Sequence, residues 1–177
     1  MQLMPGKIAA ARVAGILNPK FQVHAYSVNL TAQGLASVDP VGQIDFGGSE
    51  YAPAGRMPIQ PQRRRAEDPY QWWDLGRGTY FVTCNETLEL AEDEIALIEP
   101  DDRLLRTGAW HVPLFVRGHI APVEILLEVG VPRLRVKENA RLSRVRLFRL
   151  GGNSADAHPT AAVAKKKTAP AKRASKR

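Results

Sequence analysis

The sequence lacks the features that define several large classes of protein. It contains one cysteine, Cys84, so no disulfide can form within the chain, and this usage favours a reducing, cytoplasmic compartment. No apolar run approaches the roughly 20 residues that cross a bilayer. The N-terminal stretch contains Lys7 and Arg12 and no cleavage site, so no signal peptide is expected. These absences argue against a disulfide-rich secreted domain and against a membrane protein.

Common nucleotide-binding and metal-binding motifs are also absent. Neither GxxxxGK[ST] nor GxGxxG occurs, which excludes a P-loop and a dinucleotide fingerprint. The zinc deaminase signature needs a Cys-x-x-Cys pair that a single cysteine cannot supply. His111 and His119 are the pair that neighbouring strands would bring together around a metal, but no third ligand is evident. Cys84 lies in the apolar run "YFVTCN" and is expected to be a buried structural thiol rather than a nucleophile.

Acidic residues are missing from the C-terminal end of the chain. The formal net charge is +7, and residues 161–177 contain seven lysines and arginines and no acid. The rest of the chain therefore carries 18 basic and 18 acidic side chains and is neutral. We expect a folded β domain over residues 1–150 and a disordered linker and Lys/Ala-rich tail over residues 151–177. The tail suits either weak, salt-sensitive attraction to nucleic acid or a solubilising role.

Short apolar runs separated by Gly, Pro, Asn and Asp make up most of the chain after residue 20. Such runs at close spacing predict a mainly β barrel or sandwich, and the absence of a βαβ rhythm argues against a Rossmann-type fold. Before them, "PGKIAAARVAGIL" has apolar residues near helical spacing. Pro5 suits a first helical turn and Asn18-Pro19 suits a helix end, so a short N-terminal helix is expected.

The segment between residues 54 and 78, "AGRMPIQPQRRRAEDPYQWWDLGRG", is rich in Pro, Arg and Gln and is expected to form a long surface loop. Its run of three arginines, Arg63–Arg65, either attracts phosphates or is solvated and balanced by the acids that follow it. Trp72 and Trp73 either stack on a base or pin the loop to the barrel. The sequence leaves both pairs of alternatives open.

Five segments resemble, in chain order, motifs of the dCTP deaminase and dUTPase superfamily, in its dCTP deaminase-like branch. They are "AYSVNL" (25–30), "LGRGTYFVTCNETLELAEDEIALIEP" (75–100), "PDDRLLRTG" (100–108), "HVPLFVRGHIAPVEILLEV" (111–129) and "ENARLSRVRLF" (138–148). The third lies where the family has Pro-Arg-Ser-Ser-Leu-x-Arg-x-Gly, and the fourth ends in a strand similar to Ile-x-Leu-Glu. The order and spacing of the motifs, more than any single motif, carry the resemblance.

This resemblance implies a distorted jelly-roll-like β-barrel of the dUTPase type that works as a homotrimer, with nucleotide sites between subunits. It implies a deoxynucleoside triphosphate bound with magnesium, and no zinc. Glu128 matches the family's catalytic glutamate, the base that activates water for deamination. Arg106 matches the arginine that orients the water and the substrate. The substrate-binding candidates are Asp102, Arg103, His111, Arg141 and Arg144.

The chain departs from the family pattern at several of these positions. The Arg-Ser-Ser motif is replaced by Asp101-Asp102-Arg103, which puts two negative charges where triphosphate oxygens would lie. The turn that carries the dUTPase aspartate is replaced by Arg117-Gly118-His119, which has no carboxylate. Arg144 stands where the last strand of the family has a glutamine.

We therefore expect a zinc-independent, dCTP deaminase-like hydrolase. The alternatives are a dUTP diphosphatase, or a catalytically inactive trimeric homologue that binds nucleotides or serves a structural role, with a tail that attracts nucleic acid. The plain alternative for Glu128 is a strand-end carboxylate that faces solvent or an arginine.

Overall fold

One curled, antiparallel sheet dominates the computed structural model, which describes residues 1–39 and 41–151. The strands are β1 (Gln2–Leu3), β2 (Val13–Ala14), β3 (Val28–Val38), β4 (Arg56–Ile59), β5 (Trp72–Cys84), β6 (Thr87–Glu89), β7 (Glu94–Pro100), β8 (Ala109–Trp110), β9 (Leu114–Val116), β10 (His119–Ile120), β11 (Glu124–Lys137) and β12 (Arg141–Arg149). The helices are α1 (Gly6–Ala10), α2 (Pro19–Gln22) and α3 (Asp102–Arg106). The predicted tail, residues 152–177, lies outside the described residues.

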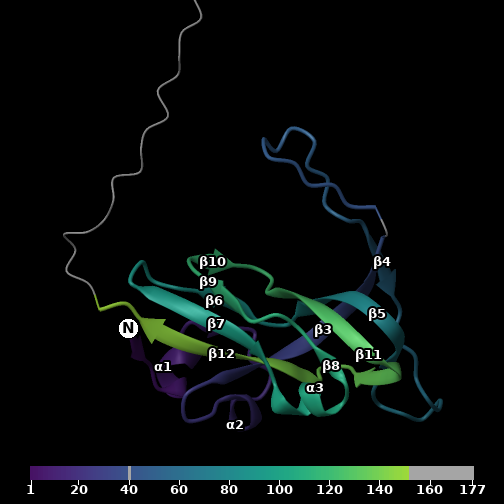
Figure 1. Ribbon diagram of the computed structural model, residues 1–177. Coiled ribbons are helices and arrows are strands. Elements are labelled where there is room, and N and C mark those ends of the chain that lie inside the picture. Colours follow the sequence, from purple (N-terminus) through teal and green to yellow (C-terminus); the bar gives the residue numbers. More distant parts are fainter. Residues whose placement is uncertain (40, 152–177) are drawn as a thin grey trace, which may run out of the picture.

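The sheet turns a corner at β3. Its strand order is β8-β11-β5-β3-β12-β7-β9, with β1 added beside β12 and β4 beside β3. The first half of β3, from Val28 to Thr31, pairs with β12, whereas the second half, from Ala32 to Ser37, pairs with β5. Figure 1 shows the result, with β7 and β12 on one side of β3 and β5 and β11 on the other.

A small second sheet of order β10-β6-β2 completes the curled half-barrel. The predicted mainly β, jelly-roll-like architecture is confirmed. No helix in the described part of the chain is long and apolar enough to span a membrane.

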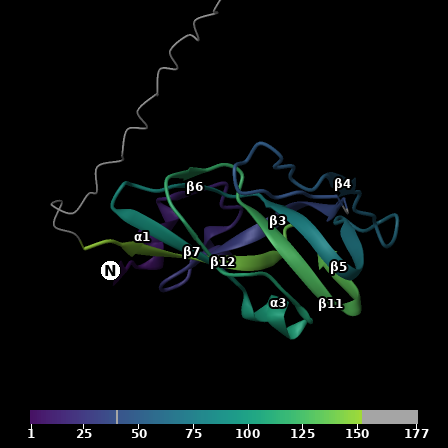
Figure 2. The same ribbon diagram turned by 45° about the horizontal axis from the view of Figure 1, so that its top comes forward.

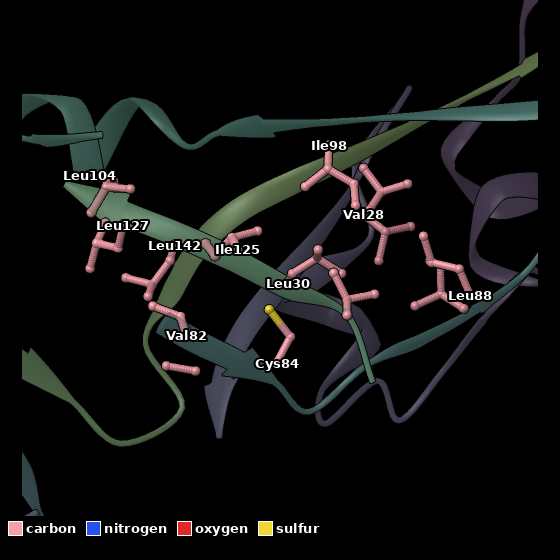
Figure 3. Packing of buried hydrophobic residues seen from close by; sticks show 14 of the residues in the cluster. Val28, Leu30, Val82, Cys84, Leu88, Ile98, Leu104, Ile125, Leu127 and Leu142 are labelled. Atoms are coloured by element: carbon pink, nitrogen blue, oxygen red, sulfur yellow. The ribbon is translucent and has the colours of Figure 1, made fainter. Parts of the chain in front are cut away.

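Alternation along the long strands separates a buried face from an outer face. On β11, Ile125, Leu127 and Val129 are buried, whereas Leu126 and Glu128 between them point outward. Figure 3 shows the inward side chains of β3, β5, β11 and β12 packed together. Cys84 lies within this cluster, and burial raises its pKa to about 12. The thiol is therefore neutral, and the expected structural role is confirmed.

The N-terminal helix is present but ends earlier than its apolar spacing suggests. Helix α1 stops at Ala10, and Val13 then pairs with β6 as part of β2. Gly15 ends β2 with a turn that needs glycine, because it adopts a φ of +81° and a Cβ there would lie 2.3 Å from the carbonyl oxygen of Asn85. Asn18 does not end α1; it caps α2, with Pro19 in the first turn.

The segment expected to be one long loop contains two strand portions. Residues 56–59 form β4, and β5 already begins at Trp72, so only residues 60–71 connect them. The prediction was wrong because it treated Pro58 as evidence against a strand. β4 pairs with β3 alone and is therefore an edge strand, where a missing backbone N–H costs no ladder hydrogen bond.

Two carboxylates, Glu86 and Glu94, are buried, and their pKa values are shifted in opposite directions. Glu86 accepts hydrogen bonds from Gln22 and from the amide and hydroxyl of Thr31, but burial dominates and raises its pKa. Burial acts in the same direction on Glu94, yet hydrogen bonds from Arg12, the Ala91 amide and Arg149 outweigh it and lower the pKa. Glu94 therefore stabilises the fold as an anion.

We expect Glu94→Gln to destabilise the protein by about 2 kcal/mol at neutral pH, because each carboxylate oxygen accepts from two donors, and the oxygen that becomes an amide nitrogen leaves both without a buried acceptor. The folded pKa lies below the ordinary value of 4.5, so this stabilisation is present above that pH and is lost as the pH falls through the folded pKa. Urea unfolding measured from pH 7 to pH 3 should show that the difference in free energy of unfolding between wild type and variant becomes smaller. The exposed Glu92→Gln serves as the control, and a difference that stays constant with pH would contradict this account.

Candidate active site

Glu128 lies on the outer face of the sheet, between two strands. In register it faces Thr79 of β5 on one side and Trp110 of β8 on the other. The Thr79 hydroxyl donates a hydrogen bond of 2.9 Å to Oε1 of Glu128. The carboxylate is half-buried, and its neighbours Leu126 and Trp110 are 47% and 46% exposed. Glu128 thus lies on the solvent side of the sheet, as the plain alternative expects, and its side-chain partner among the described residues is Thr79 rather than an arginine.

The charged turn that precedes β8 is built around Asp101. Its side chain caps α3 by accepting a hydrogen bond from the Arg103 amide at 3.0 Å, and it also accepts one from Asn29 Nδ2 at 2.9 Å. The Asp101 amide donates to the carbonyl of Leu142 on β12. The first of the two unexpected carboxylates therefore has a structural role, because it ties α3 to β3 and β12.

Arg144 neutralises the second carboxylate. Its Nη2 donates to Asp102, and its Nε lies 3.4 Å from Glu99 Oε1. Arg144 is 20% exposed, so this ion pair is partly shielded from water. The repulsion expected between the acidic turn and a phosphate is therefore weakened by an arginine that stands where the family has a glutamine.

The other arginines of the prediction lie around α3. Arg103 and Arg106 are both exposed on this helix. Arg141 donates from Nη1 to the carbonyl of Phe21 at 2.6 Å. Arg103 and Arg141 line a common cavity of about 700 Å³ between α3 and the turn from β11 to β12. The structure thus brings Arg103 and Arg141 to one cavity, and pairs Asp102 with Arg144.

His111 is buried rather than presented to a ligand. Its Nδ1 donates to the carbonyl of Val112 at 3.0 Å, and Nε2 accepts from the Ser143 hydroxyl at 2.8 Å. Burial lowers the pKa of His111, which keeps it neutral at pH 7. His119 is exposed and pairs with Glu89, so the two histidines lie in different surroundings. Within residues 1–39 and 41–151, no group of three or more His, Cys, Asp or Glu is placed to hold a metal ion.

Sequence reasoning missed the partners of the candidate residues. Thr79 and Glu99 hold Glu128 and Arg144, yet neither was a candidate site residue, and only the strand register identifies them. Among the described residues, no hydrogen bond or ion pair joins Glu128 to the α3 arginines. The nearest link is Gly108, whose φ of +78° lets the turn after α3 approach Val131 of β11.

Comparison with known proteins gives sequence relatives and a structural neighbour. No family model matches the chain. Over 131 residues, 73% of each chain, it is 27% identical to the "Probable deoxyuridine 5'-triphosphate nucleotidohydrolase" of Methanosarcina acetivorans and 24% identical to the protein of the same name from Methanosarcina mazei. The 2'-deoxycytidine 5'-triphosphate deaminase of Agrobacterium tumefaciens superposes with a TM-score of 0.61 at 16% identity.

That superposition covers 85% of this chain and 48% of the deaminase chain, so the chain spans about half the length of this structural neighbour. At such identity the superposition shows a common fold. The matches to the two Methanosarcina proteins extend over 73% of this chain, and this chain shares its fold with the deaminase. The sequence matches and the common fold confirm the predicted resemblance to the dCTP deaminase/dUTPase superfamily.

Proposed function

We propose that the protein hydrolyses a pyrimidine deoxynucleoside triphosphate, and specifically that it deaminates dCTP with water to give dUTP and ammonia. The observation that carries the proposal is the setting of Glu128. Its carboxylate is half-buried on the outer face of β11, with Oε1 held by Thr79 and with no protein hydrogen bond to Oε2 among the described residues. A carboxylate fixed through one oxygen presents the other to a water molecule.

In this mechanism Glu128 accepts a proton from the water as the water oxygen bonds to C4 of cytosine. The same carboxyl group then passes the proton to the amino group, which leaves as ammonia, and the second proton of the water ends on N3 of the uracil ring. Thr79 positions Glu128 through its hydrogen bond to Oε1. The exposed Leu126 and Trp110 beside the carboxylate suit contact with a second copy of the chain, which supports a site between subunits of a homotrimer.

The triphosphate would be held on the α3 side of the site. Arg103 and Arg106 are exposed there and free to turn toward phosphate oxygens, since no carboxylate pairs with either within the described residues. Asp102 is a hard oxygen donor with its side chain 71% exposed, and it fits as a ligand of a magnesium ion that accompanies the substrate. When bound, the metal would offset negative charge on the phosphate oxygens.

A second candidate is cleavage of dUTP to dUMP and pyrophosphate. The names of the Methanosarcina relatives favour it. The absence of a carboxylate in the Arg117-Gly118-His119 turn disfavours it, because that turn would carry the dUTPase aspartate. Product analysis separates the two, since deamination releases ammonia and diphosphatase activity releases pyrophosphate.

We expect Glu128→Gln to lower turnover of dCTP at least 100-fold, because an amide cannot take the proton from water. The matched control is Glu124→Gln, four residues earlier on the outer face of the same strand, where the carboxylate pairs with Arg56. The assay follows dUTP and ammonia with magnesium present. Full activity of Glu128→Gln would refute the assigned base, and pyrophosphate release from dUTP with dCTP left intact would favour the second candidate.

Binding of the substrate is testable without turnover. A ligand at 100 times its Kd raises the free energy of unfolding by about 2.7 kcal/mol, so dCTP should raise the melting temperature of Glu128→Gln. Replacing both Arg103 and Arg106 by Gln should remove most of this stabilisation for the triphosphate and little for the monophosphate. The control replaces Arg117, whose side chain donates to the Glu92 carbonyl on another part of the surface. Equal stabilisation of all variants would rule out α3 as the phosphate site.

A further inference from the structure

A basic and aromatic groove surrounds Trp72, away from Glu128. Three adjoining cavities of about 390, 240 and 700 Å³ all include Trp72 in their lining. We define the Trp72 groove by the side chains that two or more of these cavities share, together with Arg63, which lines the first. These are Arg63, Arg64, Tyr70, Trp72, Arg135 and Lys137. We propose that the Trp72 groove binds single-stranded nucleic acid, with an unstacked base on the Trp72 ring and backbone phosphates on the surrounding cations.

The two adjacent tryptophans have different roles, which resolves one alternative that the sequence left open. Trp73 is 2% exposed, and its indole N–H donates to the carbonyl of Ile59 at 2.9 Å, which pins β4 to the sheet. Trp72 points to the opposite face of β5, because successive residues of a strand alternate. There it is half-buried and lines open cavities. Trp72 is therefore placed to stack on a ligand, whereas Trp73 is not.

Cations gather over the aromatic rings of the groove. Lys137 lies directly opposite Trp72 in the β5–β11 register, with its Nζ 3.6 Å from the Tyr70 ring centre and 5.7 Å from that of Trp72. The guanidinium of Arg64 lies 5.6 Å from the Trp72 ring centre. No carboxylate lies within ion-pair distance of either cation in the part of the chain that the structure describes. Both charges are therefore available to an anion.

A row of cations extends the groove along β11. Arg133, Arg135 and Lys137 occupy alternate positions of the strand, so their side chains share one face at a repeat of about 6.7 Å. This repeat is close to the separation of successive phosphates in an extended strand. Asp74 takes up part of this charge by pairing with Arg133 and Arg135. The remaining excess of cations is local, because residues 1–160 are neutral overall.

The chemistry favours a single strand over a duplex. In a duplex the bases are stacked on one another and cannot reach an aromatic side chain, whereas single-strand binding combines stacking platforms with a positively charged groove. Figure 2 shows β4, β5 and β11 together at the end of the molecule where the groove lies. The irregularity of β11 between Val129 and Arg133 separates this end from Glu128. The proposal therefore does not rest on the proposed catalytic function.

The test measures binding of a fluorescein-labelled 15-nucleotide oligo(dT) to the full chain by anisotropy over a range of salt concentrations. Trp72→Ala should weaken binding about tenfold, in keeping with the loss of one stacked base, and Trp72→Phe should retain most of it. The double variant Arg64→Gln/Arg135→Gln should lower the slope of log affinity against log salt by about 1.4. The charge-matched control, Arg77→Gln/Arg117→Gln, should leave the slope close to that of wild type.

All variants keep residues 161–177, so any contribution of the basic tail is the same throughout. Groove variants that bind like wild type would overturn the proposal and assign the binding to the tail. A duplex of the same length that binds equally well would also overturn it, since charge alone would then suffice. Trp72→Phe keeps an aromatic ring at this position. If it still binds, the weaker binding of Trp72→Ala is due to the lost ring rather than to misfolding. Trp72 and Arg135 also line the cavity of about 700 Å³ that Arg103 lines, so oligonucleotide binding and not deoxynucleotide turnover decides the proposal.

Discussion

The fold depends on how β3 changes partners at Thr31. Its first half belongs to the β12 side of the sheet and its second half to the β5 side, so the ladder hydrogen bonds are interrupted at the corner. The amide of Thr31 would be left without an acceptor there, and a buried, unsatisfied N–H is costly. The carboxylate of Glu86 accepts this N–H at 2.8 Å, as well as the Thr31 hydroxyl at 2.7 Å. The Glu86 carboxylate thus supplies the hydrogen-bond acceptor that a neighbouring strand would otherwise provide at the corner of the sheet.

This corner decides which candidate residues can act together. β12 carries Arg141 and Arg144 on one side of it, and β11 carries Glu128 on the other. Helix α3 connects the two sides, because Asp101 binds Asn29 of β3 and Gly108 approaches Val131 of β11. The acidic turn that departs most from the family pattern is therefore also the segment that joins the proposed phosphate-binding arginines of α3 to the strand that carries Glu128. Its carboxylates are compatible with a nucleotide site because one caps a helix and the other pairs with an arginine.

The sequence predicted the features that follow from alternation along a strand and from the order of the motifs. It predicted few of the contacts that depend on how the strands are aligned with one another. The inward residues Ile125 and Leu127 of β11 and the buried thiol of Cys84 follow from local pattern. Thr79 does not, because its place opposite Glu128 depends on the register between β5 and β11, which no local pattern sets. The Asp102–Arg144 pair joins residues 42 positions apart and exists only because β7 and β12 pair as they do. β4 was missed because Pro58 is judged by its local effect, whereas its position at a sheet edge is a tertiary property.

The two adjacent tryptophans at the start of β5 allow two registers of the strand that bury one indole ring each. Two indoles of equal size stand side by side, so sliding the strand by one residue would exchange them between interior and exterior with no change in the apolar area they bury. Hydrophobic burial of these rings alone cannot choose between the two alignments. The choice falls to the rest of β5, because the same slip would turn the buried Leu75 and Val82 toward water. The indole N–H of Trp73, which donates to the carbonyl of Ile59, adds a directional contact that Trp72 could make only in the wrong alignment.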